Sequence, residues 1–223
     1  MKFILPDRQT KILGSSRTDA MVSANDAAFE LFLYDEPLED FPAFIKLFNK
    51  NLPQDIRAMS IVEVDSMFNI IQNPNFKEYL YLFSFGEKYH PFCAPLMATI
   101  QEDLNIDLMK AGAKLFEGSR NFKNYCVAPS EYTVFERIIV KSEITENQVY
   151  TANFFPKTSF VFRVQGAGFL RNQIRLMMGA LIQLGKGELQ LTDIEKSLQP
   201  ENRQVRNFIA PAAGLILNRI EFE

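Results

Sequence analysis

Alternating side chains predict a strand in the middle of the chain. Between residues 79 and 85 an aromatic residue occupies every second position, with aliphatic or small residues between them. Successive side chains of a strand point to opposite faces, so the aromatic residues share one face. They are Tyr79, Tyr81, Phe83 and Phe85. Apolar runs predict further strands over residues 59–64, 135–144, 149–155, 160–165 and 215–222. Residues 27–34 have apolar side chains at both odd and even positions, which fits either a buried strand or a short helix.

Apolar residues spaced three and four apart predict four helices. The first and the last begin with capping residues, and the second is ended by a glycine. The expected helices run from Asp40 to near Asn51, over residues 106–117 before Gly118, over residues 169–184, and from Thr192 to just before Pro200. Hairpin-like neighbouring strands with helices between them, rather than regular strand–helix alternation, favour an α+β fold with helices packed on a largely antiparallel sheet.

The composition is that of a globular protein. Apolar residues make up 47% and aromatic residues 13% of the 223 residues, with 21 Phe and no Trp. This content excludes a disordered or fibrous chain. No stretch approaches the roughly 18 apolar residues of a membrane-spanning helix, and the early charges of the first residues do not fit a secretory signal. We therefore expect a soluble, cytoplasmic protein.

The sequence contains few residues that could support histidine-based catalysis or metal binding. Cys93 and Cys126 lie far apart, and His90 is the single histidine. Zinc sites need clustered Cys and His ligands, which this spacing does not provide. We expect reduced thiols and a packed loop histidine, and neither a cofactor nor a metal.

The charge distribution is uneven. The whole chain carries a net charge of −3 and has a pI near 5.4, which argues against a general nucleic-acid binder. Residues 147–187 nevertheless contain no Asp or Glu and carry +5, which leaves −8 on the rest. The basic residues of this window are Lys157, Arg163, Arg171, Arg175 and Lys186. This window is where a polyanion could dock.

Two features carry candidate chemistry. Arg171 and Arg175 stand four residues apart and would project from nearly the same helix face, where two cations favour a nearby anion. That anion could be an RNA phosphate, a glutamate elsewhere, or Asp19 in the stretch SSRTDAMVSA. The residues themselves also allow plainer interpretations: a solvated pair of arginines, and a turn in which Asp19 caps its own backbone.

Five segments together resemble one family. SRTDA (residues 16–20) is similar to the GRTDAG motif of the TruA-type tRNA pseudouridine synthases, and GAGFLRNQIRLMMGALIQLGKG (166–187) resembles the family's GxxFLxxxVRxxVG helix. The other three segments are NKNLPQDI (49–56), FKEYLYLF (76–83) and PAAGLILNRIEF (211–222). They occur in family order and at family spacing over nearly the whole chain. The resemblance implies the pseudouridine synthase fold and an enzyme that isomerises uridine to pseudouridine in the anticodon stem and loop of tRNA.

The resemblance also implies a site. The nucleophilic aspartate of the family falls on Asp19, and the arginine that pairs with it falls on Arg175. The arginine that helps displace the target base falls on Arg17, and the tyrosine that packs on the flipped base falls on Tyr79. An arginine partner favours the ionised form of a carboxylate in a partly dry pocket. An aromatic ring provides a stacking surface for an extruded base. Contacts to phosphates outside the reaction centre are expected from Arg163 and Arg171.

The sequence departs from the family pattern at several points. Ser16, Met21 and Ser23 stand where the family has Gly, Gly and His. At Met21 a Cβ is added where a family glycine would serve a positive φ or a close approach to RNA. The opening strand and helix of the family would precede Met1. We expect two similar half-domains, residues 1–74, truncated and carrying the SRTDA motif, and residues 75–223.

A sheet without its first strand exposes an unpaired edge, which proteins usually protect. We therefore expect a homodimer, as in the family, or a rearranged first segment. The alternative to an active enzyme is an inactive paralogue or fragment that retains RNA binding.

Overall fold

The computed structural model describes residues 1–16, 18–202 and 208–222. The chain forms two compact units. The first consists of Met1–Ser16 and Ala28–Asn73, and the second of Arg17–Ala27 and Pro74–Glu223. The short segment that carries Asp19 therefore groups with the second unit. The two half-domains expected from the sequence stay a prediction.

The first unit pairs two strands and one helix. β1 (Thr10–Gly14) and β3 (Phe29–Leu33) are antiparallel, so the ambiguous apolar run forms a strand. α1 (Phe41–Asn51) begins after Asp40, as predicted, and the Asp40 carboxylate accepts a hydrogen bond from the Ala43 N–H at 2.8 Å.

The second unit is built on a mixed but mostly antiparallel sheet. Within the described residues the strand order is β2-β9-β4-β8-β7-β6, with β5 beside β4. The pairs β2·β9 and β4·β5 are parallel, and the other neighbours are antiparallel. The strands are β2 (Ser23–Ala24), β4 (Pro74–Phe85), β5 (Ala98–Ile100), β6 (Gly118–Asn121), β7 (Glu136–Glu146), β8 (Phe160–Gly166) and β9 (Leu215–Phe222).

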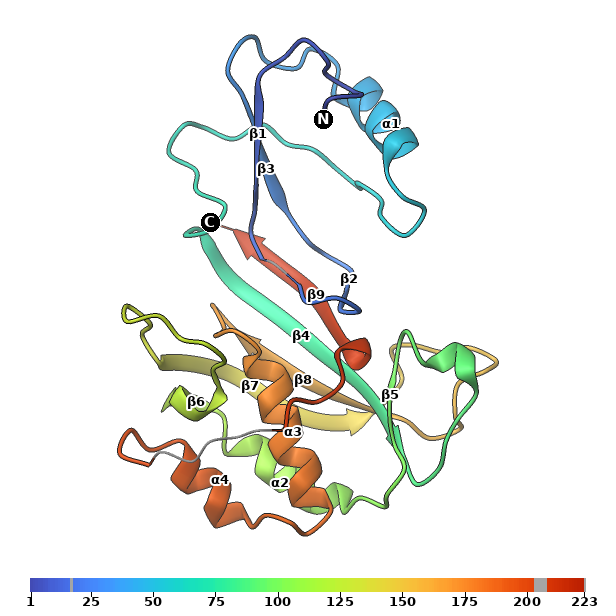
Figure 1. The fold of residues 1–223 in the computed structure, drawn as a ribbon, viewed down its shortest axis with the longest axis vertical. Helices are drawn as coiled ribbons and strands as arrows, with labels where there is room; N and C mark the ends of the chain where they lie inside the picture. Colours follow the sequence, from blue (N-terminus) through green and yellow to red (C-terminus); the bar gives the residue numbers. More distant parts are fainter. Residues whose placement is uncertain (17, 203–207, 223) are drawn as a thin grey trace. The chain divides into compact units, whose positions relative to one another are not determined.

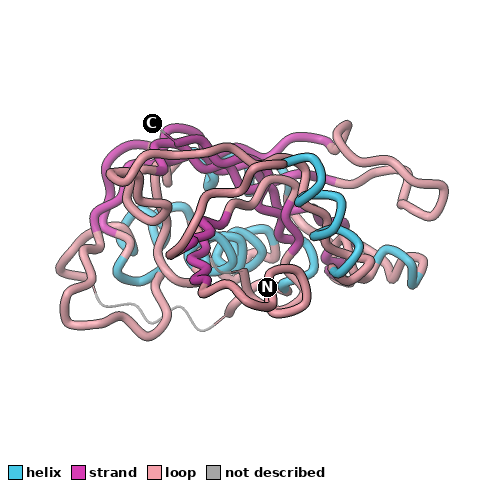
Figure 2. Tube along the Cα trace, turned by 90° about the horizontal axis from the view of Figure 1, so that it is seen from above, coloured by secondary structure: helices cyan, strands magenta, loops and turns pink. Residues whose placement is uncertain are grey.

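Helices cover one face of this sheet (Figures 1 and 2). They are α2 (Ile106–Lys114), α3 (Gln173–Gly185) and α4 (Leu191–Ser197). Single 3-10 turns lie at Pro91–Cys93, Lys123–Tyr125 and Ala212–Gly214. α3 is buried on nearly all sides, because it belongs to the core between the sheet and the other helices. The predicted α+β class is confirmed.

The central strand β4 shows the predicted alternation. Tyr81 and Phe83 are fully buried in the core under the helices, and Tyr79 and Phe85 pack against that core. The intervening leucines belong to a smaller cluster on the opposite face of the sheet. The aromatic residues therefore share one face, and that face is the one covered by helices.

Two predicted strands are absent from the described chain. Residues 59–64 form no regular element, and Met59 and Val62 are exposed, so their hydrophobicity does not reflect burial in a sheet. Residues 149–155 are a loop, because the Asn147 side chain accepts the backbone N–H groups of Val149 and Tyr150 and closes a turn.

Helix boundaries also differ from those predicted. α3 begins at Gln173 rather than at residue 169, after Asn172 in the left-handed conformation. The helix expected from Thr192 is capped by Gln190, which forms the capping box with Asp193. The helix expected to run to residue 117 ends at Lys114. Among the residues that the structure describes, no helix combines the length and the apolar content needed to cross a membrane.

Candidate active site

The segment that carries Asp19 is fixed to the edge of the main sheet. β2 pairs with Ile216 and Leu217 of β9, and the Asn25 N–H donates to the Leu217 carbonyl at 2.8 Å. The Asp26 carboxylate accepts the Ile220 N–H at 3.1 Å. These bonds anchor the segment just beyond Asp19. Arg17, which the sequence places in the site, lies outside the described residues.

Asp19 and Arg175 are in direct contact. Arg175 Nη1 lies 2.6 Å from Asp19 Oδ2. Arg175 Nε donates to the carbonyl of the buried Ala210 at 2.8 Å, so the guanidinium is held from two sides. The Arg175 side chain is 17% exposed and the Asp19 side chain 46% exposed. The pair therefore combines a largely buried, fixed cation with a carboxylate that solvent or a substrate can reach.

A further residue, which is not among the predicted site residues, completes this contact. The side-chain amide of Asn172 donates to the same oxygen, Asp19 Oδ2, at 2.8 Å. Asn172 precedes α3 and has φ 60° and ψ 13°. An Asn just before a helix ordinarily caps that helix, so no sequence pattern places Asn172 beside Asp19.

Met21 adopts the backbone conformation that its family counterpart suggests. Its φ is 68°, in the left-handed region where glycine is the ordinary residue. The side chain is 67% exposed, so it gains little from packing in return for this strain. The departure from glycine at this position therefore has a local energetic cost.

Tyr79 and Arg171 lie in the same unit as the ion pair. The Tyr79 ring is half-buried and meets Phe169 edge-on, with ring centroids 5.3 Å apart. Val22, three residues after Asp19, packs against the same core as Tyr79. The Arg171 side chain is exposed, and its carbonyl accepts the Val127 N–H at 3.1 Å. The roles expected of Tyr79 and Arg171 stay predictions.

Comparison with known proteins identifies the family. A family model described as tRNA pseudouridine synthase matches residues 113–223. "tRNA pseudouridine synthase A 2" of Bacillus cereus (strain ATCC 10987 / NRS 248) is 34% identical over 216 residues, which cover 96% of this chain and 83% of the relative. The chain belongs to the tRNA pseudouridine synthase family. "tRNA pseudouridine synthase A" of Exiguobacterium sp. (strain ATCC BAA-1283 / AT1b) is 32% identical over 96% of this chain and 81% of its own. The protein of the same name from Staphylococcus aureus (strain MRSA252) is 32% identical, and the match covers 96% of this chain and 76% of that protein.

Arg163 lies on a different face of this synthase-family sheet. It is opposite Leu80 in the β4·β8 register, whereas Tyr79 is opposite Val164, so the side chains of Arg163 and Tyr79 point to opposite faces. Arg163 pairs with Glu78 at 2.8 Å and with Glu143 at 3.8 Å. The structure thus does not bring Arg163 to the Asp19–Arg175 pair, and its expected contact with phosphate stays a prediction.

Glu78 is the centre of a polar network on that face. Its side chain accepts hydrogen bonds from Arg163, Gln165 and Asn218 at 2.8, 2.5 and 2.6 Å. Burial alone would raise the pKa of Glu78, but the bonds from Gln165, Arg163 and Asn218 outweigh it and hold the pKa below its usual value. Asn218 also accepts from Asn25 in the Asp19 segment at 2.8 Å. The network therefore connects that segment to the middle of the sheet.

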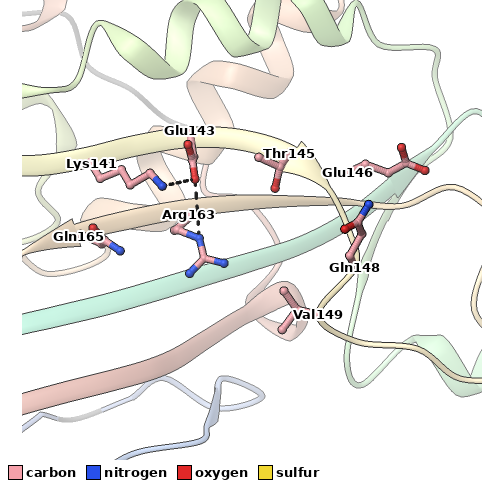
Figure 3. A pocket seen from close by; sticks show the side chains of 8 residues that line it. All are labelled: Lys141, Glu143, Thr145, Glu146, Gln148, Val149, Arg163 and Gln165. Atoms are coloured by element: carbon pink, nitrogen blue, oxygen red, sulfur yellow. Dashed lines mark ion pairs between the residues drawn. The ribbon is translucent and has the colours of Figure 1, made fainter.

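A shallow pocket lies beside this network (Figure 3). Its walls come from β7, β8 and the loop after β7, and they carry both signs of charge. Within it Glu143 forms ion pairs with Lys141 and Arg163. The lining residues are Lys141, Glu143, Thr145, Glu146, Gln148, Val149, Arg163 and Gln165. Because its cations are already paired with carboxylates, the pocket does not present the free positive charge that an RNA phosphate needs.

The histidine and the two cysteines are not part of the ion pair. The His90 ring packs edge-on against Phe92 and near Phe154, in a loop as expected. Burial raises the pKa of the Cys93 thiol, and Cys93 and Cys126 are both free. No group of three or more potential metal-binding side chains occurs in the part of the chain that the structure describes.

Proposed function

We propose that this chain is an isomerase that converts uridine to pseudouridine in tRNA, with Asp19 as the nucleophile. The observation that supports it is the 2.6 Å contact between Asp19 and Arg175, in a member of the tRNA pseudouridine synthase family. A carboxylate that must act as an anion near a sugar needs a fixed cation beside it, and Arg175 is fixed by its second bond to Ala210.

The reaction defines what the site must do. The bond between ribose C1′ and uracil N1 breaks, and a bond between C1′ and C5 forms. C5 loses its proton and N1 gains one, so the product is an isomer of the substrate. As the nucleophile, the Asp19 carboxylate forms a bond to C1′ while the C1′–N1 bond breaks, and C5 of the detached base then displaces the carboxylate from C1′ and regenerates it. The 46% exposure of the Asp19 side chain leaves it accessible to the sugar. No external oxidant or reductant enters this balance.

The remaining residues serve RNA binding in this proposal. Tyr79 provides an aromatic surface for the extruded base, and Arg17 occupies the space that the base leaves. The exposed Arg171, four residues before Arg175, contacts a phosphate near the target nucleotide. Arg163 is assigned no phosphate contact in this proposal, because its guanidinium pairs with Glu78 and Glu143 on the other face of the sheet. We propose uridines of the anticodon stem and loop as the targets.

The test uses tRNA carrying tritium at C5 of uridine, because each turnover releases that label to water. Purified wild-type chain should release tritium and produce pseudouridine. Asp19→Asn should abolish release while tRNA binding, measured by filter retention, stays within about twofold. Replacing single uridines of the anticodon arm by cytidine then locates the target. If wild-type chain binds tRNA yet releases no label where a related synthase does, the catalytic proposal is wrong and RNA binding alone remains.

We also propose that the chain is a homodimer in solution. Such an assembly would cover an edge strand of the described sheet, β2 or β6, which would otherwise present unpaired backbone groups. Sedimentation equilibrium should give a mass near twice the 25.6 kDa of the chain. A monomer at micromolar concentration would contradict this proposal without affecting the proposed activity.

A further inference from the structure

We infer that Asn172 is a positioning residue, which together with Arg175 holds Asp19 Oδ2 so that Asp19 Oδ1 faces the substrate. The inference rests on the proposed function, because positioning matters only if Asp19 acts on a nucleotide. It assigns to Asn172 a role that differs from that of Arg175: the arginine provides charge and the amide provides orientation.

The side chain of Asn172 is committed to Asp19 rather than to its own helix. Asn172 is the N-cap residue of α3, a position where the side-chain oxygen usually accepts a backbone N–H of the first turn. No such bond forms here. Instead the amide nitrogen donates to Asp19 Oδ2, across 153 positions of sequence. The ordinary stabilising contact of a cap is thus replaced by a contact to the carboxylate.

The backbone of Asn172 is also adapted to this contact. With φ 60° and ψ 13° it lies in the left-handed region, which most residues other than glycine avoid and which Asn and His enter more readily. The next residue keeps the turn closed, because the buried Gln173 side chain accepts the Leu170 N–H at 2.8 Å. The Leu176 N–H donates to the Asn172 carbonyl at 3.0 Å. The turn therefore sets the direction in which the Asn172 side chain leaves the backbone, and the bond to Asp19 holds the amide at its end.

Two donors on one oxygen restrict the carboxylate. Arg175 Nη1 and Asn172 Nδ2 both reach Oδ2, at 2.6 and 2.8 Å. Among the described residues none donates to Oδ1. One donor leaves the carboxylate free to rotate about its Cβ–Cγ bond, whereas two donors from different directions fix that torsion. Oδ1 is then left free in a constant direction for the sugar, and small displacements of a reacting atom are known to cost large factors in rate.

The experiment compares three variants in steady-state tritium release. Asn172→Gly keeps the left-handed conformation and removes the amide, and it should lower kcat by about 10- to 100-fold while KM for tRNA changes by less than about twofold. Asn172→His supplies an N–H donor in a residue that tolerates the left-handed region, and it should recover part of the loss. The matched control is Asn105→Gly, since Asn105 caps α2 through its own side chain, which accepts the Leu108 N–H at 3.0 Å. It should keep kcat.

A second measurement does not depend on activity. The side-chain amide NMR signal of Asn172 should shift when Asp19 is changed to Ala, and it should stay in place when the exposed Asp107 on α2 is changed to Ala. The inference is overturned if Asn172→Gly retains wild-type kcat, if that variant changes KM alone, or if the chemical shift of the Asn172 amide is unchanged in Asp19→Ala. An inactive wild-type chain would instead refute the proposed function, and the NMR arm would still decide whether the amide binds Asp19.

Discussion

Changing either partner of the Asp19–Arg175 pair should abolish activity, but the two changes should differ in their cost to stability. Asp19→Asn removes a charge from a half-exposed side chain. Arg175→Met removes the same ion pair and also the donor to Ala210, a residue with no exposed surface. The structure therefore predicts equal functional loss and unequal thermodynamic loss.

The magnitudes follow from burial. An ion pair with one half-exposed partner contributes about 0.2–1 kcal/mol, which bounds the cost of Asp19→Asn. A buried carbonyl left without its donor costs about 1–3 kcal/mol more. Arg175→Met should thus lower the free energy of unfolding by about 1–4 kcal/mol, because the methionine fills much of the volume but cannot donate. Asp19→Asn should lower it by less than about 1 kcal/mol.

Urea unfolding followed by far-UV circular dichroism measures both values, and tritium release measures the activity. Arg171→Met is the control for stability, because that side chain is exposed on the same segment and should change unfolding by less than about 0.5 kcal/mol. If Arg175→Met and Asp19→Asn destabilise equally, the bond to Ala210 contributes nothing and the view of Arg175 as a fixed cation is wrong.

Three further predictions concern stability. The pKa of Glu78 is held low in the folded state, so the ionised carboxylate stabilises the fold above about pH 4.3, and this stabilisation is lost as the pH falls through the folded pKa. The urea midpoint of the wild-type chain should therefore fall on acidification, and that of Glu78→Gln should fall less. Gly179→Ala should lower the free energy of unfolding by about 1–3 kcal/mol, because an added Cβ would lie 2.0 Å from the Phe208 carbonyl oxygen. Gly168→Ala is the control, because a Cβ there meets nothing within 4 Å, and it should leave the urea midpoint nearly unchanged. Met21→Gly should raise the thermal midpoint, because it removes about 1–2 kcal/mol of left-handed strain from an exposed side chain, and an unchanged or lower midpoint would contradict this.

Local patterns predicted the elements whose energetics are local. The aromatic alternation of residues 79–85 identifies β4 and its buried face, and Asp40 marks the start of α1, because both depend on neighbours in sequence. Residues 149–155 show the limit of prediction from local sequence patterns. Their apolar side chains suggest a strand, yet the Asn147 side chain takes the backbone donors that a strand would need. Tyr150 and Phe154 still pack against the smaller apolar cluster from within a loop. Hydrophobicity thus predicted burial there but not backbone pairing.

The site required more than local patterns. Asp19 and Arg175 are 156 positions apart, and their pairing was expected only because two motifs of one family carry them. Asn172 is not predictable as a site residue from the sequence, because an Asn before a helix has an ordinary local explanation as a cap. Its contact with Asp19 depends on a left-handed turn that periodicity does not reveal. Tertiary placement, rather than composition, decides which of two chemically reasonable partners such a side chain takes.

Residues with a strained backbone lie in the Asp19 segment and in the segments that contact α3 near Asn172. In the described parts of the chain, the residues other than glycine with positive φ are Met21, Ala128 and Asn172. Met21 is two residues after Asp19, Asn172 binds Asp19, and Ala128 follows Val127, whose N–H donates to the carbonyl of Arg171. Such conformations persist only where the surrounding structure imposes them, and they are common at functional sites. Here β9 bonds the backbone shortly after Met21, and the first turn of α3 bonds the carbonyl of Asn172, so both residues belong to segments held by neighbouring structure. The strain therefore belongs to the means by which Asp19 is held, which is why relieving it at exposed Met21 should stabilise the fold, whereas removing the amide at Asn172 should cost turnover.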